Sequence, residues 1–412
     1  MLSEKDNERL TRVGPGTPMG NLLRRYWMPV AISAEVDDVP RHKRLLGEDL
    51  VVFRTPGGKV GVVQDRCSHR RTQLTVGIVE ADGIRCGYHG WKFGLDGKCL
   101  EQPPEPRMIP RADIVAYPAE ELGGLVFCYM GPQPAPLLPR YDLFVMENCL
   151  RDVGWSHYKF NWLQAMENAV DPYHGEWLHG HFMNAVRARQ GKPPVRHYAR
   201  KHAKVGFDAF DYGIIKRRLL EGQREEEEDG WRIGHPLLFP NMVKIGGAGF
   251  QQFQIRVPMD DTNIWHLWYT IYTPPGKVPE QKVVPGYQVP IEDENGEPIV
   301  DFIDGQDAEA WGRQGPIADR TKELLGHADT GIAIYRQMLK ENIERVEAGQ
   351  DPMAVQRDAA KNRVIELPVE KSKNFADDKA YIAGILNAQA VCYSPQNKML
   401  KELFGVADTV RA

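Results

Sequence analysis

Two short segments decide the fold of the first part of this chain: Cys67-Ser68-His69-Arg70-Arg71 and Cys86-Gly87-Tyr88-His89-Gly90-Trp91-Lys92-Phe93. Each segment follows a predicted strand and supplies one thiolate and one imidazole. Two β-hairpin loops therefore present four ligands to one site. A zinc finger usually takes two cysteines from one loop and two histidines from another element. The alternating order here instead suits a two-iron cluster, in which one iron binds both cysteines and the other binds both histidines.

These segments resemble the cluster-binding loops of Rieske proteins, and Cys86–Phe93 resembles the ring-hydroxylating oxygenase branch of that family. The resemblance implies a Rieske [2Fe-2S] cluster bound by Cys67, His69, Cys86 and His89. In the first loop, Ser68 and Arg71 stand where the family commonly has proline and glycine. A zinc ribbon and an unligated pair of core loops are the alternatives.

The sequence around these loops predicts an all-β domain over residues 46–135. Short β-branched runs at 50–53 and 60–63 flank a Pro56-Gly57-Gly58 turn, a pattern typical of a hairpin. Residues 1–45 are expected to form an N-terminal extension that packs on this domain. The proline-rich stretch at 131–139 is expected to be a linker.

Residues 136–412 are predicted to form a second, catalytic domain of the α+β class, with strands followed by helices. The family resemblance implies a helix-grip (START-like) fold with an antiparallel sheet. No clear period is visible at 274–318, which predicts a lid or a subunit contact there. The expected helices span 160–180 and about 319–347, and the expected strands span 204–219, 230–238, 243–257 and 264–272.

A second group of possible ligands lies within residues 161–181. Glu167, Asp171 and His174 recur at i, i+4 and i+7, which is one helical face, although a solvated face is the simpler alternative. His174 and His179 are five residues apart and meet only if the helix is distorted between them. Pro172 and Gly175 are suited to such a distortion.

The spacing Asp171-x-x-His174-x-x-x-x-His179 resembles the mononuclear-iron motif of the same oxygenases. The resemblance implies that His174 and His179 bind iron and that Asp171 links this site to a neighbouring Rieske cluster. His181 is then expected to be a structural residue.

A non-heme Fe(II) site with two histidines needs a carboxylate from elsewhere in the chain. Asp329 lies between Leu325 and Ile332 in the predicted apolar stripe of the 319–347 helix, where an unpaired carboxylate would be costly to bury. The surrounding residues 314–331 resemble the phthalate-dioxygenase-like branch, which implies that Asp329 is the third iron ligand. A buried aspartate paired with an arginine is the alternative.

Composition excludes several classes of function. The 412 residues carry a net charge of −4, which offers no basic excess for nucleic acid. The sequence has no run of 18 apolar residues, so no membrane span is predicted. The charged N-terminal segment is unlike a secretory signal. Six irregularly spaced cysteines favour reduced thiols and a cytoplasmic location.

The resemblance implies a terminal oxygenase that uses O₂ to hydroxylate an aromatic, carboxylated substrate. Because no flavin or nicotinamide motif is visible, electrons are expected from a separate NAD(P)H-dependent reductase with flavin and iron–sulfur centres. The family also implies a homo-oligomer, a trimer or a hexamer. Candidates to pair with a substrate carboxylate are Arg187, Arg189, Lys192 and Arg196.

Three alternatives stay open from the sequence. The same machinery could work as an aryl-ether O-demethylase or monooxygenase. A non-catalytic Rieske electron carrier would leave Asp171, His174, His179 and Asp329 without a role. A zinc-stabilised binding protein would contain no iron and would be colourless.

Overall fold

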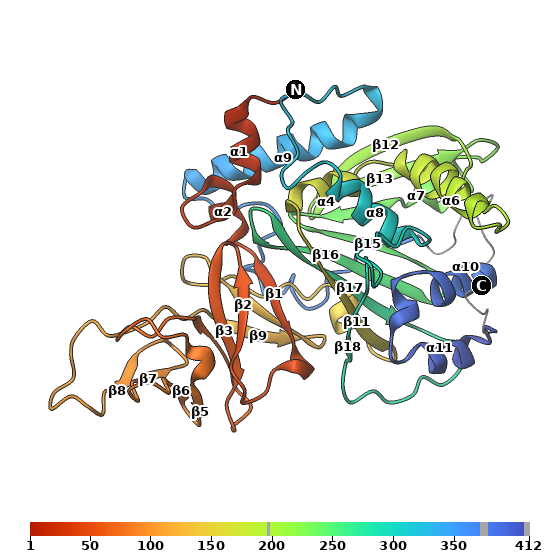
Figure 1. Cartoon of the computed structure of the whole chain (residues 1–412). Coiled ribbons are helices and arrows are strands. Elements are labelled where there is room, and N and C mark those ends of the chain that lie inside the picture. The colour runs from red at the N-terminus through yellow and green to blue at the C-terminus, as the bar shows by residue number, and fades with distance from the viewer. Residues whose placement is uncertain (196–197, 371–377, 408–412) are drawn as a thin grey trace.

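The structure, a computed structural model, describes residues 1–195, 198–370 and 378–407 (Figure 1). Two short helices open the chain, α1 (Glu4–Thr11) and α2 (Pro18–Leu23). Three small antiparallel sheets follow, with strand orders β1-β10-β9, β2-β3-β4 and β5-β6-β7-β8. Their strands are β1 (Trp27–Ile32), β2 (Arg41–Leu45), β3 (Glu48–Arg54), β4 (Val60–Gln64), β5 (Ile78–Glu80), β6 (Gly83–Arg85), β7 (Lys92–Gly94), β8 (Cys99–Glu101), β9 (Ala119–Leu122) and β10 (Leu125–Tyr129).

These sheets give the all-β first part that the sequence predicts. The expected hairpin joins β3 to β4, and Gly58 adopts a φ of +84° in its turn, a conformation that favours glycine. Strand β1 lies before the expected boundary at residue 46, and it pairs with β10 near the end of this part. The boundaries at 46 and 136 remain predictions.

The rest of the chain is organised around an eight-stranded sheet in the order β12-β13-β14-β15-β16-β17-β11-β18. Neighbouring strands are antiparallel except for β18, which runs parallel to β11. The α+β class is therefore confirmed. The strands are β11 (Leu150–Tyr158), β12 (His202–Phe210), β13 (Gly213–Leu220), β14 (His235–Leu238), β15 (Met242–Gly247), β16 (Phe250–Asp260), β17 (Asn263–Tyr272) and β18 (Gly286–Gln288).

Helix α4 packs against β16 of this sheet and also contacts α8 and α9 (Figure 1). The aromatic strand β17 is buried as predicted, with Trp268, Tyr269 and Tyr272 inside the core. The helices of this part are α3 (Asp142–Val145), α4 (Trp162–Ala169), α5 (His174–Glu176), α6 (Met183–Arg189), α7 (Asp229–Arg232), α8 (Ile303–Gly312), α9 (Thr330–Glu347), α10 (Asp378–Ala388) and α11 (Asn397–Phe404).

The predicted start of the long C-terminal helix is wrong, whereas the lid or subunit contact expected at 274–318 stays a prediction. The long helix α9 begins at Thr330 rather than near residue 319, and Leu324 before it is 87% exposed. The backbone N–H and hydroxyl of Thr321 both donate to Asp319, which favours a turn where a helix was expected. The segment 274–318 contains β18 and α8. Helix α8 buries polar and small residues as well as Trp311, so its sequence lacks an apolar period.

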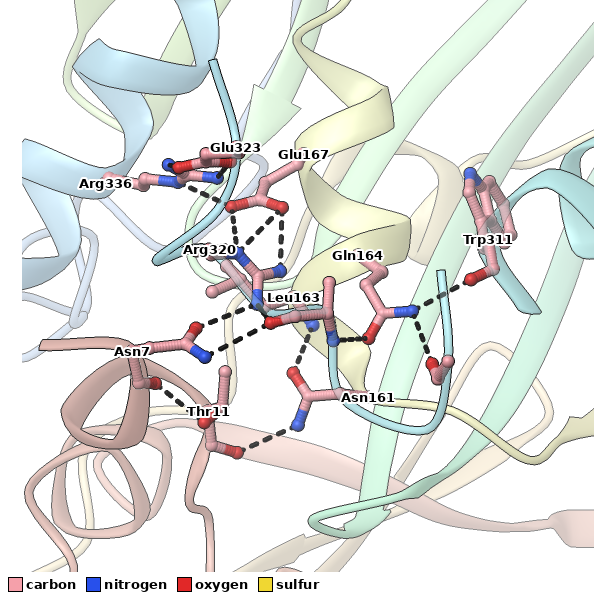
Figure 2. Close-up of polar contacts among 12 residues, drawn as sticks. Asn7, Thr11, Asn161, Leu163, Gln164, Glu167, Trp311, Arg320, Glu323 and Arg336 are labelled. Carbon is pink, nitrogen blue, oxygen red and sulfur yellow. Dashed lines mark hydrogen bonds and ion pairs between the residues drawn. The ribbon is translucent and has the colours of Figure 1, made fainter. Parts of the chain in front are cut away.

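A buried ionic network fixes α4 in place (Figure 2). The Glu167 carboxylate on α4 accepts hydrogen bonds from Arg320 at 2.7 and 2.9 Å and from Arg336 of α9 at 2.6 Å. Glu323 also pairs with Arg336, at 2.9 Å. Because α4 ends at Ala169, this network anchors the element that leads directly into the segment with Asp171 and His174.

Candidate functional site

The two Cys–His loops share one hydrogen-bond pattern. The N–H of Cys67 donates to the Thr72 carbonyl at 2.9 Å, and the N–H of Cys86 donates to the Trp91 carbonyl at 2.8 Å. The fifth residue of each loop is in the left-handed region, Gly90 at φ +76° and Arg71 at φ +61°. Arg71 therefore keeps the turn that the family commonly makes with glycine, at a conformational cost of about 1 kcal/mol.

In these loops the thiols of Cys67 and Cys86 are buried, whereas the imidazoles of His69 and His89 are partly exposed. Burial and the neighbouring thiol of Cys86 raise the pKa of Cys67 to about 11. The rings of His69 and His89 lie 4.5 Å apart at 70°. Two facing thiols would become costly buried anions unless a metal neutralised them, so the donor set fits a cationic cluster.

A single tetrahedral ion would need all four donors of these loops close to one another. Among the described residues, the groups of three or more donors whose ligand atoms all lie within 4.8 Å of one another do not include these four side chains. One tetrahedral zinc would require that closeness. The layout of paired thiols and paired imidazoles suits two metals instead.

The second candidate site begins where α4 ends. Oδ1 of Asp171 accepts a hydrogen bond from the N–H of Tyr173 at 2.8 Å, and Oδ2 lies 3.3 Å from Nδ1 of His174, without the alignment of a hydrogen bond. Burial raises the pKa of Asp171, but the neighbouring His174 outweighs burial and lowers it to about 2. Asp171 is therefore a permanent anion beside this imidazole.

A π-helical turn at Trp177–Phe182 brings the two histidines together. The widened turn places residues five apart on one side of the helix, and the rings of His174 and His179 lie 5.1 Å apart at 85°. The predicted distortion is confirmed. His181 points away from this group, since it is exposed and packs against Trp177 at 4.7 Å.

The carboxylate beside these histidines is Asp307, not Asp329. One ligand atom from each of His174, His179 and Asp307 lies within 4.8 Å of the others, and Oδ1 of Asp307 is 3.3 Å from Nε2 of His179. Asp307 lies on α8 and is partly buried. Burial raises its pKa, but His179 outweighs burial and lowers it.

The prediction that Asp329 is the third iron ligand is wrong. Helix α9 begins at Thr330, so Asp329 lies just before the helix rather than inside it. Asp329 ends a short 3₁₀ turn, is partly exposed, and accepts a hydrogen bond from the N–H of Gly326 at 2.7 Å. Its side chain therefore stabilises the 3₁₀ turn before α9, makes no capping hydrogen bond to α9 itself, and lies outside the apolar stripe. A signal for Asp307 was present, because Asp304, Asp307 and Trp311 recur at three and four residues, as on one helical face.

The donors fit a mononuclear iron. With Nδ1 of His174 facing Asp171 and Nδ1 of His179 facing Gln306, each ring keeps Nε2 for a metal. Two imidazole nitrogens and one carboxylate oxygen form the set that non-heme Fe(II) prefers.

A cavity of about 1070 Å³, its open mouth included, adjoins these three residues. Two buried cations also line it, Lys216 of β13 and Arg256 of β16. Burial lowers the pKa of Lys216 to about 8 and that of Arg256 to about 10. Of the basic residues expected to meet a substrate, Arg187, Arg189 and Lys192 do not line the cavity, and Arg196 lies outside the described residues.

Within the described part of the chain, no helix is both long enough and apolar enough to cross a membrane.

Comparison with known proteins places these features in a family. Residues 26–118 match the Rieske [2Fe-2S] domain. The chain is 41% identical over 377 residues to the 5,5'-dehydrodivanillate O-demethylase oxygenase subunit of Sphingobium sp. (strain NBRC 103272 / SYK-6), an alignment that covers 89% of this chain and 87% of that protein. It is 30% identical over 422 residues to the phthalate 4,5-dioxygenase oxygenase subunit of Pseudomonas putida, with 91% and 94% covered.

The fold has relatives among solved structures. The terminal oxygenase of carbazole 1,9a-dioxygenase from Novosphingobium sp. KA1 superposes with a TM-score of 0.58 at 21% identity, over 80% of this chain and 96% of that chain. Oxygenases of this kind use a Rieske cluster together with a mononuclear non-heme iron. A chain that aligns with oxygenase subunits over nearly its whole length shares their ancestry, and this one belongs to the Rieske non-heme iron ring-hydroxylating oxygenases, as a terminal oxygenase subunit of the phthalate 4,5-dioxygenase-like branch.

Proposed function

We propose that this chain oxygenates an aromatic carboxylate at an iron held by His174, His179 and Asp307. The observation that carries the proposal is the convergence of these three side chains beside a cavity that contains two buried cations. Iron bound there would supply O₂ activation, because three protein ligands leave further positions open. The surrounding residues orient the ligands and bind the substrate.

The charge balance of the cavity favours an anionic substrate. The guanidinium of Arg256, 2% exposed, donates to the carbonyl and Oε1 of Gln254, while its Nε has no partner. Lys216, 7% exposed, donates from Nζ to the carbonyl of Asp171 at 3.1 Å. No carboxylate of the described residues lies within 4.0 Å of either cation.

Buried cations without a counter-ion are costly, and a substrate carboxylate would remove that cost. The nearby carboxylates have other partners: Asp304 accepts from Nε1 of Trp268 at 2.7 Å, and Asp171 faces His174. We therefore assign carboxylate recognition to Lys216 and Arg256.

O-demethylation of an aryl methyl ether is the second candidate reaction. It is favoured by the 41% identity to an enzyme named as an O-demethylase oxygenase subunit. Both reactions need the same iron centre and differ in which substrate atom lies nearest to it.

Substrate-dependent O₂ uptake tests this function. The iron-loaded protein, a surrogate reductase and NADH are combined with aromatic carboxylates, with and without a ring methoxy group, and each acid is matched with its carboxamide. We expect uptake only with the acids, and product analysis then separates ring hydroxylation from methyl loss. Equal rates with acid and amide would contradict carboxylate recognition.

Variants localise that recognition. Arg256→Met and Lys216→Met should each raise KM for the acid by roughly 10- to 100-fold, which is the worth of a charge-assisted hydrogen bond. Lys204→Met is the matched control, since Lys204 is exposed and pairs with Glu225 at 2.7 Å. It should leave KM unchanged.

We further propose a homo-oligomer, a trimer or a hexamer, in which electrons cross between subunits. In Figure 1 the β5–β8 sheet, in which the loop with Cys86 and His89 joins β6 to β7, lies at the opposite end of the molecule from helix α6, which follows the π-helical turn. Both regions expose aromatic side chains, Tyr88 next to His89 and Trp177 near Asp171. Exposed aromatic side chains are typical of protein interfaces.

The electron donor would be a separate NAD(P)H-dependent reductase with flavin and iron–sulfur centres. We propose that both proteins act in the cytoplasm, where the four cysteines that are not cluster ligands, Cys99, Cys128, Cys149 and Cys392, stay reduced.

A further inference from the structure

Two consecutive residues of α8 contact both nitrogens of one imidazole. Oε1 of Gln306 lies 2.9 Å from Nδ1 of His179, and Oδ1 of Asp307 lies 3.3 Å from Nε2 of the same ring. Gln306 is completely buried. A buried amide that contacts a candidate iron ligand needs an explanation, because the apolar interior favours amides only when both ends are hydrogen-bonded.

The second contact of Gln306 fixes the direction of its amide. Nε2 of Gln306 donates to the carbonyl of Val300 at 2.9 Å. A backbone carbonyl can only accept, so the NH₂ group must face Val300. The reversed amide would set two carbonyl oxygens against each other. Oε1 therefore faces His179.

This orientation also fixes the proton of His179. An amide oxygen accepts hydrogen bonds and cannot donate, so Nδ1 of His179 must carry the hydrogen. The neutral ring then has its lone pair on Nε2, the nitrogen that faces Asp307. A metal needs such a lone pair.

We propose that Gln306 is a positioning residue that holds His179 with Nε2 directed at the mononuclear iron. The proposal rests on the proposed function, in which His179 is an iron ligand. It assigns the two histidines different partners: the carboxylate of Asp171 faces His174, and a neutral amide faces His179.

Charge explains why an amide suits this position. Asp304 is buried and Asp307 is partly buried on the same helix, and burial of Asp304 together with the charge of Asp307 raises the pKa of Asp304 to about 6. A glutamate at position 306 would add a third carboxylate to this helix face. Glutamine orients the ring without adding negative charge.

Iron binding by variants of the cluster-loaded protein tests the proposal. Gln306→Leu removes both hydrogen bonds, whereas Gln306→Glu keeps an oxygen that can accept from Nδ1. The matched control is Gln164→Leu, because Gln164 is a similarly buried glutamine of α4 that bonds the carbonyls of Trp311 and Gly315 (Figure 2) and makes no hydrogen bond to either histidine of the described site.

Two readouts are needed. Chelator competition gives the dissociation constant of the third iron, and the EPR spectrum of its nitric oxide complex reports the ligand geometry. We expect Gln306→Leu to weaken iron binding 10- to 100-fold, the usual effect of losing the partner of a metal-bound histidine, and to change the nitrosyl spectrum. Gln306→Glu should lose less affinity. Gln164→Leu should lower the melting temperature without changing either readout.

Wild-type affinity and an unchanged nitrosyl spectrum in Gln306→Leu would overturn the proposal. So would an equal loss of iron in Gln306→Leu and Gln164→Leu, which would indicate a general effect of removing a buried amide. If the wild-type protein binds only the two cluster irons, the proposed function itself fails. The three results are distinguishable because the cluster is counted separately by its visible absorption.

Discussion

At the candidate iron centre, the position of one aspartate within a helix separates a ligand from a cap. Asp307 lies in the middle of α8 and faces His179, whereas Asp329 comes immediately before α9 and bonds the N–H of Gly326. Both residues have the same chemistry and both lie near apolar residues in the sequence. Only their place relative to the helix start distinguishes them.

Exchanging each aspartate for alanine tests this distinction. Asp307→Ala should lose the mononuclear iron while the cluster keeps its visible and EPR spectra. Asp329→Ala should keep all three irons and lose about 1 kcal/mol of stability, the usual net contribution of one hydrogen bond, here the one from the N–H of Gly326. Iron analysis and thermal melts of both variants check the prediction, and loss of iron only from Asp329→Ala would contradict it.

Asp171→Asn should keep both metals and lower turnover by roughly 100-fold or more, because the neutral amide no longer orients His174 as an anion does. Since the pKa of Asp171 is lowered to about 2, the wild-type carboxylate stays charged throughout the working pH range. Iron counts together with O₂ uptake check this result. Full activity would remove the proposed role of Asp171 in linking the two centres.

The pKa of Lys216, lowered by burial to about 8, predicts a pH dependence. Below pH 8 the side chain is charged and binds a carboxylate, and above it the charge is lost. The kcat/KM for an acid substrate should therefore be constant up to about pH 7.5 and fall as the pH rises through 8 and beyond. Lys216→Arg should move this fall to higher pH, and an identical profile in that variant would assign the titration to another group.

At the scale of elements, the iron site depends on how α4, the π-helical turn and α8 are held together. The buried Glu167 of α4 pairs with Arg320 and Arg336, which join the loop before α9 and α9 itself to this helix (Figure 2). Removing one partner of a buried ionic network leaves uncompensated charge behind, which costs far more than breaking an exposed pair.

Glu167→Gln should therefore destabilise the catalytic part by about 3–5 kcal/mol, because two buried guanidinium groups lose their shared carboxylate. Glu221→Gln, which breaks the exposed pair with Lys201, is the control and should change stability by less than about 1 kcal/mol. Urea unfolding followed by circular dichroism measures both. Equal midpoints in the two variants would contradict a structural role for the network.

Elements differ in how well the sequence predicts them. The Cys–His loops, the aromatic strand β17 and the distortion between His174 and His179 follow from local spacing, and all three were predicted. Helix α8 was missed because its buried residues include Asp304, Gly305 and Gln306, which give no apolar period. Its approach to His179 joins residues more than a hundred positions apart, and no local pattern contains that contact.

The same reason explains why the two cations that line the cavity were not predicted from the sequence. Lys216 and Arg256 lie on separate strands, β13 and β16, and meet the iron site only when the sheet is assembled. Sequence proximity to His179 instead favoured Arg187 and its neighbours, but Arg187, Arg189 and Lys192 do not line the cavity. Nearness along the chain is a poor guide to which cation reaches a substrate.

At the scale of the whole molecule, one chain carries two chemically different centres in separate parts. One cluster loop follows β4 and the other joins β6 to β7, while the iron ligands lie beside the eight-stranded sheet (Figure 1). If electrons cross between subunits, the iron site of each subunit depends on the cluster of a neighbouring subunit.

Mixed oligomers test this dependence. Cys86→Ser removes a cluster ligand and Asp307→Ala removes an iron ligand, so neither protein alone should turn over substrate. Co-expressed subunits should regain a fraction of wild-type O₂ uptake, because an intact cluster in one subunit then faces an intact iron site in the next. Absence of activity in oligomers shown to contain both subunits would favour electron transfer within one chain.

The most direct test of the two-centre account is anomalous diffraction at the iron edge from crystals of the metal-loaded protein. We predict two adjacent iron peaks among Cys67, His69, Cys86 and His89, and a third, separate peak bounded by His174, His179 and Asp307. A single peak at the Cys–His loops, or no iron beside Asp307, would contradict the account.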